Sequence, residues 1–255
     1  MKKANPEFDH PTRGKNYKKA NEEMPLVRKS EIDLMLKNIN AQKGEVIVDF
    51  GCGNGVVTYS LAKQVGTKGK IIALDNSKEI LKDLLKKKNL KNIETGLLHS
   101  ERIPLPANSV NAVVTLANLH HIPNKEIIFK EFARILKNGG RLVIGDVADK
   151  TNVQKYFDGP VDRFCSTGHK HRYLDKKWAK DLCLKSGLNL MKFSIEDTPW
   201  TFEDEEQAKW FLQTIHDATC TPEKCLKEAK DYLGHVNQKG KFLLKWKLFY
   251  LVAKK

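Results

Sequence analysis

The sequence lacks any long apolar run. Its 255 residues contain no stretch of about eighteen consecutive apolar side chains, the length that a membrane-spanning helix needs. Residues 1–19 are polar and lack the apolar segment of a secretory signal. Hydrophobic residues make up 40% of the chain and charged residues 30%, a balance typical of globular rather than disordered proteins. We therefore expect a cytoplasmic location.

The sequence also lacks the cysteine pattern of a disulfide scaffold or a zinc site. Its five cysteines are scattered through a chain that is large enough to fold without disulfides. Cys220 and Cys225 are separated by four residues, but no second pair repeats this spacing, and structural zinc needs four ligands. We expect reduced thiols and no metal site.

Arginine is scarce although the chain is strongly basic. The formal net charge is +14, yet only seven of the 45 basic residues are arginine, and the lysines are spread along the chain. Phosphates and bases are gripped bidentately by arginine, so this composition disfavours a nucleic-acid partner. It predicts a diffusely basic surface that keeps the protein soluble. Attraction of an anionic substrate or an acidic carrier is the functional alternative.

Apolar strands alternate with helical patterns between residues 46 and 147. The expected strands are Val46–Phe50, Lys70–Leu74, Ile93–Leu98, Val110–Leu116 and Arg141–Val147. The expected helices between them are Val56–Val65, Lys78–Lys88 and Asn124–Leu136. This alternation of nearly continuous apolar strands with helices predicts an α/β fold, with a parallel sheet covered on both faces.

The flanking regions are less regular. Residues 1–25 are expected to lack regular structure and 25–40 to form a helix, so that 1–40 make an N-terminal lid segment. The main domain, residues 41–255, is expected to carry cap inserts at about 150–173 and 199–234, the first of them polar and irregular. A helix and a strand are expected between the inserts, and the final apolar run, Lys241–Ala253, is expected to form one strand.

Three glycines alternate directly after the first expected strand, in VIVDFGCGNG. Gly51, Gly53 and Gly55 permit a tight turn in which a ligand lies against the backbone, at the N-terminus of a helix. Asp49 precedes the turn, and Asp75 ends the next strand, where an acid can accept both hydroxyls of a ribose. A dinucleotide site has the spacing G-x-G-x-x-G. The spacing G-x-G-x-G behind an acid instead suits a cationic ligand with an ammonium group, such as S-adenosylmethionine.

Four segments in order resemble the successive motifs of class I S-adenosylmethionine-dependent methyltransferases: VIVDFGCGNG, IIALDNS, ERIPLPANSVNAVVTLANLHHI and FKEFARILKNGGRLVIGDV. The group that includes quinone-biosynthesis and small-molecule methyltransferases is the most similar. The resemblance spans about residues 44–147 and continues more weakly to 195. It implies a Rossmann-like fold with a seven-stranded, mostly parallel sheet, helices on both faces, lid inserts and S-adenosylmethionine as cofactor.

The resemblance also implies cofactor-binding roles at matched positions. The turn from Gly51 to Gly55, which includes Cys52, would cradle the methionine part, with Asp49 near its amino group. Asp75 would hold the ribose hydroxyls, and Asn76 would flank the adenine. The residues that end the fourth strand would line the methyl-transfer channel: Leu116, Ala117 and Asn118.

Two positions depart from the family pattern. His99, followed by Ser100, stands where the family commonly carries an aspartate that bonds the adenine amino group. Asn111 replaces the usual aspartate before the fourth strand. We therefore expect the adenine contact from His99, with Glu101 as the alternative.

Four histidines are candidate general bases. Methyl transfer mainly needs alignment and exclusion of water, and it needs a base only when the acceptor must lose a proton. The candidates are His120 and His121, after the fourth strand, and His169 and His171, in the segment GHKHRYLDKKW. A packing role in the core or an exposed loop is the alternative for them.

The N-terminal segment and the second insert flank the expected cleft. In related enzymes such an N-terminal segment closes over the cofactor, so Tyr17 and Arg28 are candidate lid residues. Aromatic residues of the second insert, Trp200 among them, are expected to pack that insert internally.

Three functions remain open at this level. We expect a methyltransferase that acts on oxygen or carbon of a small molecule, and the charge of +14 favours an acidic acceptor. The Asn/Asp-Pro-Pro-aromatic and Pro-Cys motifs of nucleobase methyltransferases do not occur in the sequence. The alternatives are an RNA or protein methyltransferase, and a non-catalytic domain that binds the cofactor or a partner.

Overall fold

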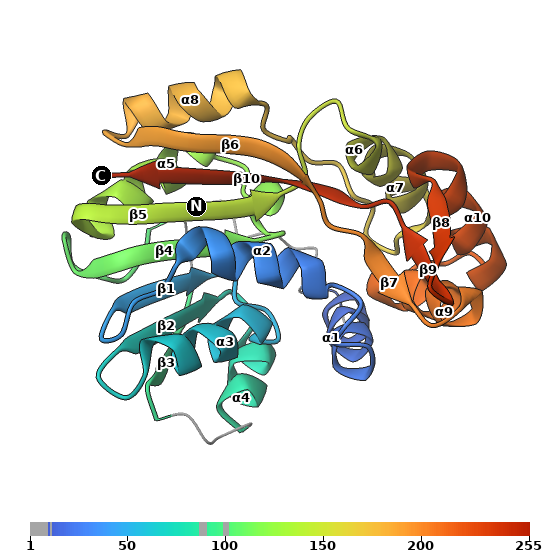
Figure 1. Cartoon of the computed structure of the whole chain (residues 1–255), viewed down its shortest axis with the longest axis horizontal. Helices are drawn as coiled ribbons and strands as arrows, with labels where there is room; N and C mark the ends of the chain where they lie inside the picture. The colour runs from blue at the N-terminus through green and yellow to red at the C-terminus, as the bar shows by residue number, and fades with distance from the viewer. Residues whose placement is uncertain (1–9, 11, 87–90, 99–101) are drawn as a thin grey trace.

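A seven-stranded sheet forms the centre of the molecule (Figure 1). The computed structural model describes residue 10 and residues 12–86, 91–98 and 102–255; His99, Ser100 and Glu101 lie outside the described residues. The strands have the order β3-β2-β1-β4-β5-β10-β6. Their bounds are β1 Val46–Phe50, β2 Lys70–Asp75, β3 Ile93–Leu97, β4 Val110–Leu116, β5 Leu136–Asp146, β6 Asn189–Asp197 and β10 Lys247–Lys254. β10 pairs antiparallel with both β5 and β6, and the other described strand pairs of this sheet are parallel.

Helices cover both faces of the sheet because the buried strands are apolar on both sides. Helices α2 (Lys29–Ile39) and α3 (Val56–Val65) pack on one face, and α5 (Lys125–Ile135) and α8 (Lys176–Lys185) pack on the other (Figure 1). Helix α4 (Lys78–Lys86) contacts β2 and β3. Successive side chains alternate between the two cores: Ile47 belongs to the first and Val48 to the second. The predicted covering of both faces is confirmed.

A smaller lobe stands beyond one end of the sheet, at the right of Figure 1. It contains a three-stranded sheet of order β7-β9-β8, with bounds Trp200–Phe202, Lys241–Leu244 and His235–Gln238. Its helices are α6 (Asn152–Tyr156), a π-helical turn (Phe157–Val161), α7 (Asp162–Phe164), α9 (Glu205–Ile215) and α10 (Pro222–Leu233). The lobe shares a continuous apolar core with the α2–α3 face of the main sheet. No helix in the described part of the chain has the length and hydropathy to cross a membrane.

Three expectations about the flanking regions are wrong. Residues 13–23 form helix α1 (Arg13–Glu23) rather than irregular chain, and the segment 150–173 contains the short helices named above. The final apolar run is two strands in two sheets, because the chain crosses from β9 to β10 at residues 245–246. Helix α1 has little apolar periodicity of its own, and contacts with α9 and its following turn hold it: Asn16 donates to Asp217 Oδ1 at 2.6 Å.

The sheet places a binding site between β1 and β4. Strand order reverses at this pair, since β2 and β3 follow on one side and β5 on the other. Ligands of open α/β sheets bind at such a switch point, outside the carboxyl ends of the strands. The glycine turn follows β1, and Leu116–Asn118 follow β4, so the two predicted motifs meet here.

Candidate functional site

The glycine turn is held tightly against the end of β4. Gly51 has φ +71°, and a Cβ atom added to it would lie 2.2 Å from Cγ of Asn118. The backbone N–H groups of Gly51 and Cys52 both donate to the carbonyl of Leu74, at 2.8 and 3.0 Å. No side chain fits at residue 51 without displacing Asn118, so glycine is required here for both conformation and space.

Asp49 is a buried acid beside this turn. Its side chain accepts a hydrogen bond from Thr58 Oγ1 at 2.6 Å, and the residue is only 2% exposed. The pKa of Asp49 is raised to about 7, mainly by burial and to a smaller extent by the negative charge of Asp75, while the hydrogen bonds from Thr58 oppose the rise. A bound cation would offset the cost of burying the charged carboxylate and would favour its ionised form.

Asp75 lies at the end of β2 with both carboxylate oxygens engaged. Oδ2 accepts from the N–H of Gly53 and Oδ1 from the N–H of Ser77, each at 3.0 Å. Burial raises the pKa of Asp75, while these backbone hydrogen bonds oppose the rise. Each oxygen keeps a second lone pair that can accept a ligand hydroxyl.

One cavity connects this acidic end with an aromatic end. The space between its lining atoms is about 840 Å³, which includes its opening to solvent. The acidic end is lined by Gly51, Gly53, Asp75, Asn76, Ile80, Leu116, Ala117 and Asn118. The other end is lined by Arg13, His120, His121, Val147, Phe157, His169, Trp200, Ile215, His216, Trp246 and Leu248. A second cavity of about 500 Å³, which Asp49 and Cys52 line, shares Gly51, Gly53 and Leu116 with the first.

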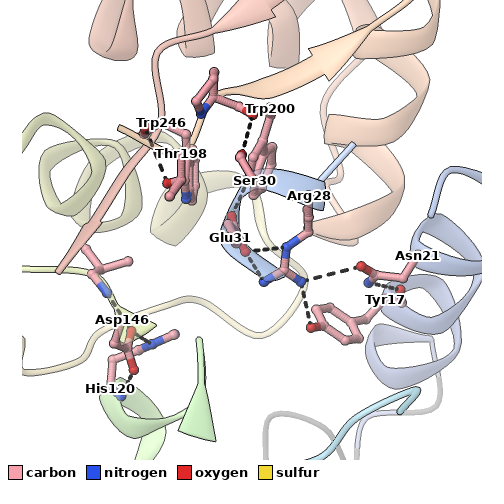
Figure 2. A network of polar contacts seen from close by, with 12 residues as sticks. Tyr17, Asn21, Arg28, Ser30, Glu31, His120, Asp146, Thr198, Trp200 and Trp246 are labelled. Atoms are coloured by element: carbon pink, nitrogen blue, oxygen red, sulfur yellow. Dashed lines mark hydrogen bonds and ion pairs between the residues drawn. The ribbon is translucent and has the colours of Figure 1, made fainter. Parts of the chain in front are cut away.

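Residues of α1 and α2 form a polar network over both cavities (Figure 2). Arg28 donates to Glu31 Oε2 from Nε at 2.9 Å and from Nη2 at 2.7 Å, and its Nη1 donates to the Tyr17 hydroxyl at 2.9 Å. Trp200 Nε1 donates to the other oxygen of Glu31 at 2.5 Å. Burial alone would lower the pKa of Arg28, but the charge of Glu31 raises it above its ordinary value. Glu31 therefore connects Arg28 to Trp200 in the lobe.

The four predicted histidines come together although about 50 residues separate the two pairs. His120 Nδ1 lies 2.6 Å from Asp146 Oδ1 at the end of β5 (Figure 2), and His121 Nδ1 lies 3.1 Å from His171 Nε2. The rings of His169 and His171 are 4.5 Å apart between centroids. Burial alone would raise the pKa of Asp146, but the charge and hydrogen bond of His120, with backbone N–H donors, hold it below its ordinary value.

The aromatic end is built from the lobe. Trp200 stacks on Trp246 with 3.9 Å between ring centroids, and Phe157 packs edge-on against His169 at 4.5 Å. The expected packing of Trp200 within the insert is confirmed by its edge-on contact with Phe211, and its ring also lines the cavity. Trp246 Nε1 is buried and has no hydrogen-bond partner among the described residues. A donor in this state is a position where a ligand or water is expected.

The structure places most of the predicted site residues on these cavity walls. Gly55 instead precedes α3 as its N-cap, and His171 stands behind His121. The sulfur atoms of Cys220 and Cys225 lie 3.1 Å apart in the lobe, away from the turn. Five further residues of the site were not predicted from the sequence: Arg13, Glu31, Asp146, Phe157 and Trp246. Only Asp146 carried a usable signal, because it ends a strand at the same edge as the glycine turn.

Ala117, directly after β4, has an unusual backbone conformation. It has φ +50°, a conformation that non-glycine residues rarely adopt, and its N–H donates to the carbonyl of Gly145 at 2.8 Å. Backbone strain of this kind concentrates at functional sites.

Known proteins share both the sequence motifs and the fold. Residues 41–180, more than half of the chain, match a family described as a methyltransferase domain. A demethylmenaquinone methyltransferase from Geobacillus sp. (strain WCH70) is 32% identical over 119 residues, which cover 46% of this chain and 51% of that protein. The chain spans about half the length of several curated relatives that it matches.

Solved structures agree over most of the chain. The YcgJ protein from Bacillus subtilis has a TM-score of 0.66 at 18% identity, covering 88% of this chain and 97% of that one. A SAM-dependent methyltransferase from Aquifex aeolicus has a TM-score of 0.58 at 18% identity, covering 94% and 97%. At these identities the likeness establishes the fold, and the predicted Rossmann-like class is confirmed. The chain belongs to the methyltransferase domain family, with S-adenosylmethionine as the cofactor of its class.

Proposed function

We propose that this protein transfers a methyl group from S-adenosylmethionine to a small molecule that binds among the aromatic and histidine side chains. One observation carries the proposal: a single cavity joins the glycine turn and Asp75 to a wall of aromatic rings and imidazoles. A donor at one end and an acceptor at the other would meet near Leu116–Asn118. Holding two reactants in line and excluding water supplies much of the catalysis of such transfers.

The residues at the acidic end fit the cofactor. Asp75 offers an acceptor for each hydroxyl of a ribose, and Asp49, in the adjoining cavity, offers a buried acid to an ammonium group. Gly51 leaves no Cβ between the backbone and the cavity. When bound, the cofactor supplies a methyl group on a positively charged sulfur. Among this chain's residues, Tyr17 and Arg28 would cover it from α1 and α2.

The other end of the cavity supports an acceptor with an apolar or aromatic body. Phe157, Trp200 and Trp246 provide flat apolar walls, and the orphaned Nε1 of Trp246 is a donor for an acceptor oxygen. The histidines stand where a polar reactive end would lie, and Arg13 adds a positive charge for an acidic group. Transfer to oxygen or carbon of such a molecule remains our proposal.

Calorimetric titration with S-adenosylmethionine and S-adenosylhomocysteine tests the cofactor half. Wild type should bind the product with micromolar affinity or better. Asp75→Ala should weaken it at least tenfold, equivalent to about 1.4 kcal/mol. Asp231→Ala removes an exposed aspartate on α10 and is the matched control, with unchanged affinity expected. A wild type that binds neither ligand would refute the proposal.

Transfer itself is tested with S-adenosylmethionine labelled in its methyl group. Candidate acceptors should include acidic metabolites and quinol-like aromatic compounds, because both fit the aromatic end with its adjacent cation. Label should appear in an organic-extractable or anion-retained small molecule. Label found only in RNA or protein would overturn the small-molecule part and leave the cofactor half intact.

A further inference from the structure

Three buried histidines meet at the acceptor end of the cavity although they come from distant segments. His120 and His121 lie in the short turn η2 (Leu119–His121) after β4, and His169 lies in the loop after α7. Each offers one ring nitrogen, and these atoms all lie within 4.8 Å of one another. Nitrogen ligands at 2.0–2.1 Å from tetrahedral zinc are about 3.3 Å apart, so shifts of about 1 Å would close the site.

The Nδ1 atom of each of these rings has a polar partner. The pairs are His120 with Asp146 Oδ1 at 2.6 Å, His121 with His171 Nε2 at 3.1 Å, and His169 with the Tyr173 hydroxyl at 3.3 Å. Histidines that bind metals almost always engage their second nitrogen in this way, which fixes the tautomer and the ring orientation. These partners fix the orientation of all three rings beside one another.

A general base alone does not account for this arrangement. A base needs one imidazole and one orienting group, and His120 with Asp146 already supplies both. His121 and His169 each have an Nδ1 partner of their own, which a base at His120 does not require. Buried imidazoles are also costly packing material, because their nitrogens need polar partners.

We propose that His120, His121 and His169 bind a divalent transition-metal ion, each through one ring nitrogen. Three neutral imidazoles suit zinc, and also iron, cobalt or nickel, whereas magnesium and calcium prefer oxygen ligands. No metal site was expected from the sequence, because the spacing of the cysteines does not suit one. The histidine ligands are 48 and 49 residues apart along the chain, and only the fold brings them together.

The site is open toward the cavity that the acceptor would enter. All three histidines line its wall, and three protein ligands leave at least one coordination position. An acceptor hydroxyl, thiol or carboxylate would occupy that position. The ion would orient it and lower the pKa of a hydroxyl or thiol. This role of the ion rests on the proposed methyltransferase function, whereas binding of the ion does not.

Metal binding is tested on the full chain without a polyhistidine tag, after treatment with a chelator. Zinc is titrated by calorimetry, and cobalt by the visible absorption of its complex. Wild type should bind one ion per chain, with the cobalt spectrum of a four- or five-coordinate site. His169→Ala should weaken the affinity at least tenfold. His235→Ala, which removes an exposed histidine on β8, should leave it unchanged. Equal affinities in the three proteins, or preference for magnesium, would overturn the site.

Binding of S-adenosylhomocysteine by the same samples separates the two proposals. If His169→Ala still binds this ligand as wild type does, the variant is folded and its loss of metal is local. Product binding without stoichiometric metal would leave the proposed function standing and refute the metal site. Stoichiometric metal in a wild type that binds no product would refute the function and support the site.

Discussion

The two ends of the cavity are built from different kinds of groups. At the acidic end, backbone N–H groups and two buried carboxylates surround a turn that continues directly from β1. At the aromatic end, the wall consists of aromatic rings and imidazoles from η2, the π-helical turn, β7 and the segment before β10. The first end depends on backbone conformation, and the second depends on how the lobe docks onto the sheet. Substitutions should therefore affect the first end through local geometry and the second through packing.

The Arg28–Glu31 ion pair is shared by both ends, and its loss should have the largest effect. Arg28→Leu leaves the carboxylate of Glu31, which is 0% exposed, without its cation. Removing one partner of a buried pair typically costs about 3–5 kcal/mol. Urea unfolding should show this loss of stability. Lys29→Met, which breaks an exposed pair with Asp33 on the same helix, should cost less than about 1 kcal/mol. Equal losses in the two variants would contradict a shared structural role.

Replacing Asp49 with asparagine should change the free energy of unfolding and the affinity for S-adenosylmethionine in opposite directions. Its folded pKa of about 7 lies above the ordinary value of 3.8, so the folded state holds the proton more tightly than the unfolded state. That stabilisation is complete below about pH 4 and is lost as the pH rises to 7. Asp49→Asn does not titrate. Relative to wild type it should gain stability with rising pH, by at most about 4 kcal/mol at pH 8.

The same variant should bind S-adenosylmethionine more weakly at pH 8, because an amide cannot balance an ammonium group. Thermal unfolding from pH 4 to pH 8, with calorimetry at pH 8, measures both effects. A stability difference that does not change with pH would show that Asp49 is not a high-pKa acid. Stronger cofactor binding in the variant would argue against its predicted contact with the amino group.

A comparison of Gly51 with Gly240, which have the same φ angle, separates the cost of the left-handed backbone conformation from the cost of a steric clash. Gly51 and Gly240 both have φ +71°, but a Cβ at residue 240 meets nothing within 4 Å. Gly240→Ala should cost about 1 kcal/mol from the left-handed conformation alone, without affecting ligand binding. Gly51→Ala should cost about 2–3 kcal/mol and weaken product binding at least tenfold, since Asn118 must move. Denaturant unfolding and calorimetry of both variants test this, and identical behaviour would exclude the steric reason.

Asp146→Asn should give the smallest effect, confined to the second end. It keeps an oxygen for backbone donors but weakens the charged contact with Nδ1 of His120. Loss of such an orienting partner typically lowers metal affinity by about tenfold or more. Cobalt titration should show this decrease, while binding of S-adenosylhomocysteine should stay unchanged. A parallel loss of product binding would show that the two ends are not independent.

Local motifs were sufficient to predict the core of the fold and the position of the glycine turn. The strands Val46–Phe50 and Val110–Leu116 and the helix Val56–Val65 have the predicted bounds. Apolar periodicity and glycine spacing report local constraints, so sequence patterns reveal them. Helix α1 was missed because its stability comes from contacts with residues about 200 positions away. The break between β9 and β10 was missed because both strands are apolar, and only the docking of the lobe separates them.

The sequence by itself determined the alternating sheet, the glycine turn and the two buried acids, since each follows from residues that are neighbours along the chain. Only the tertiary structure decided that His120, His121 and His169, from two distant segments, share one cavity wall. It also decided that Asp146 and Tyr173 hold two of their rings, and that Trp200 faces the cavity. These relations depend on how the lobe packs against the end of the sheet. Such packing is the sum of many long-range contacts and leaves no periodic signal in the sequence.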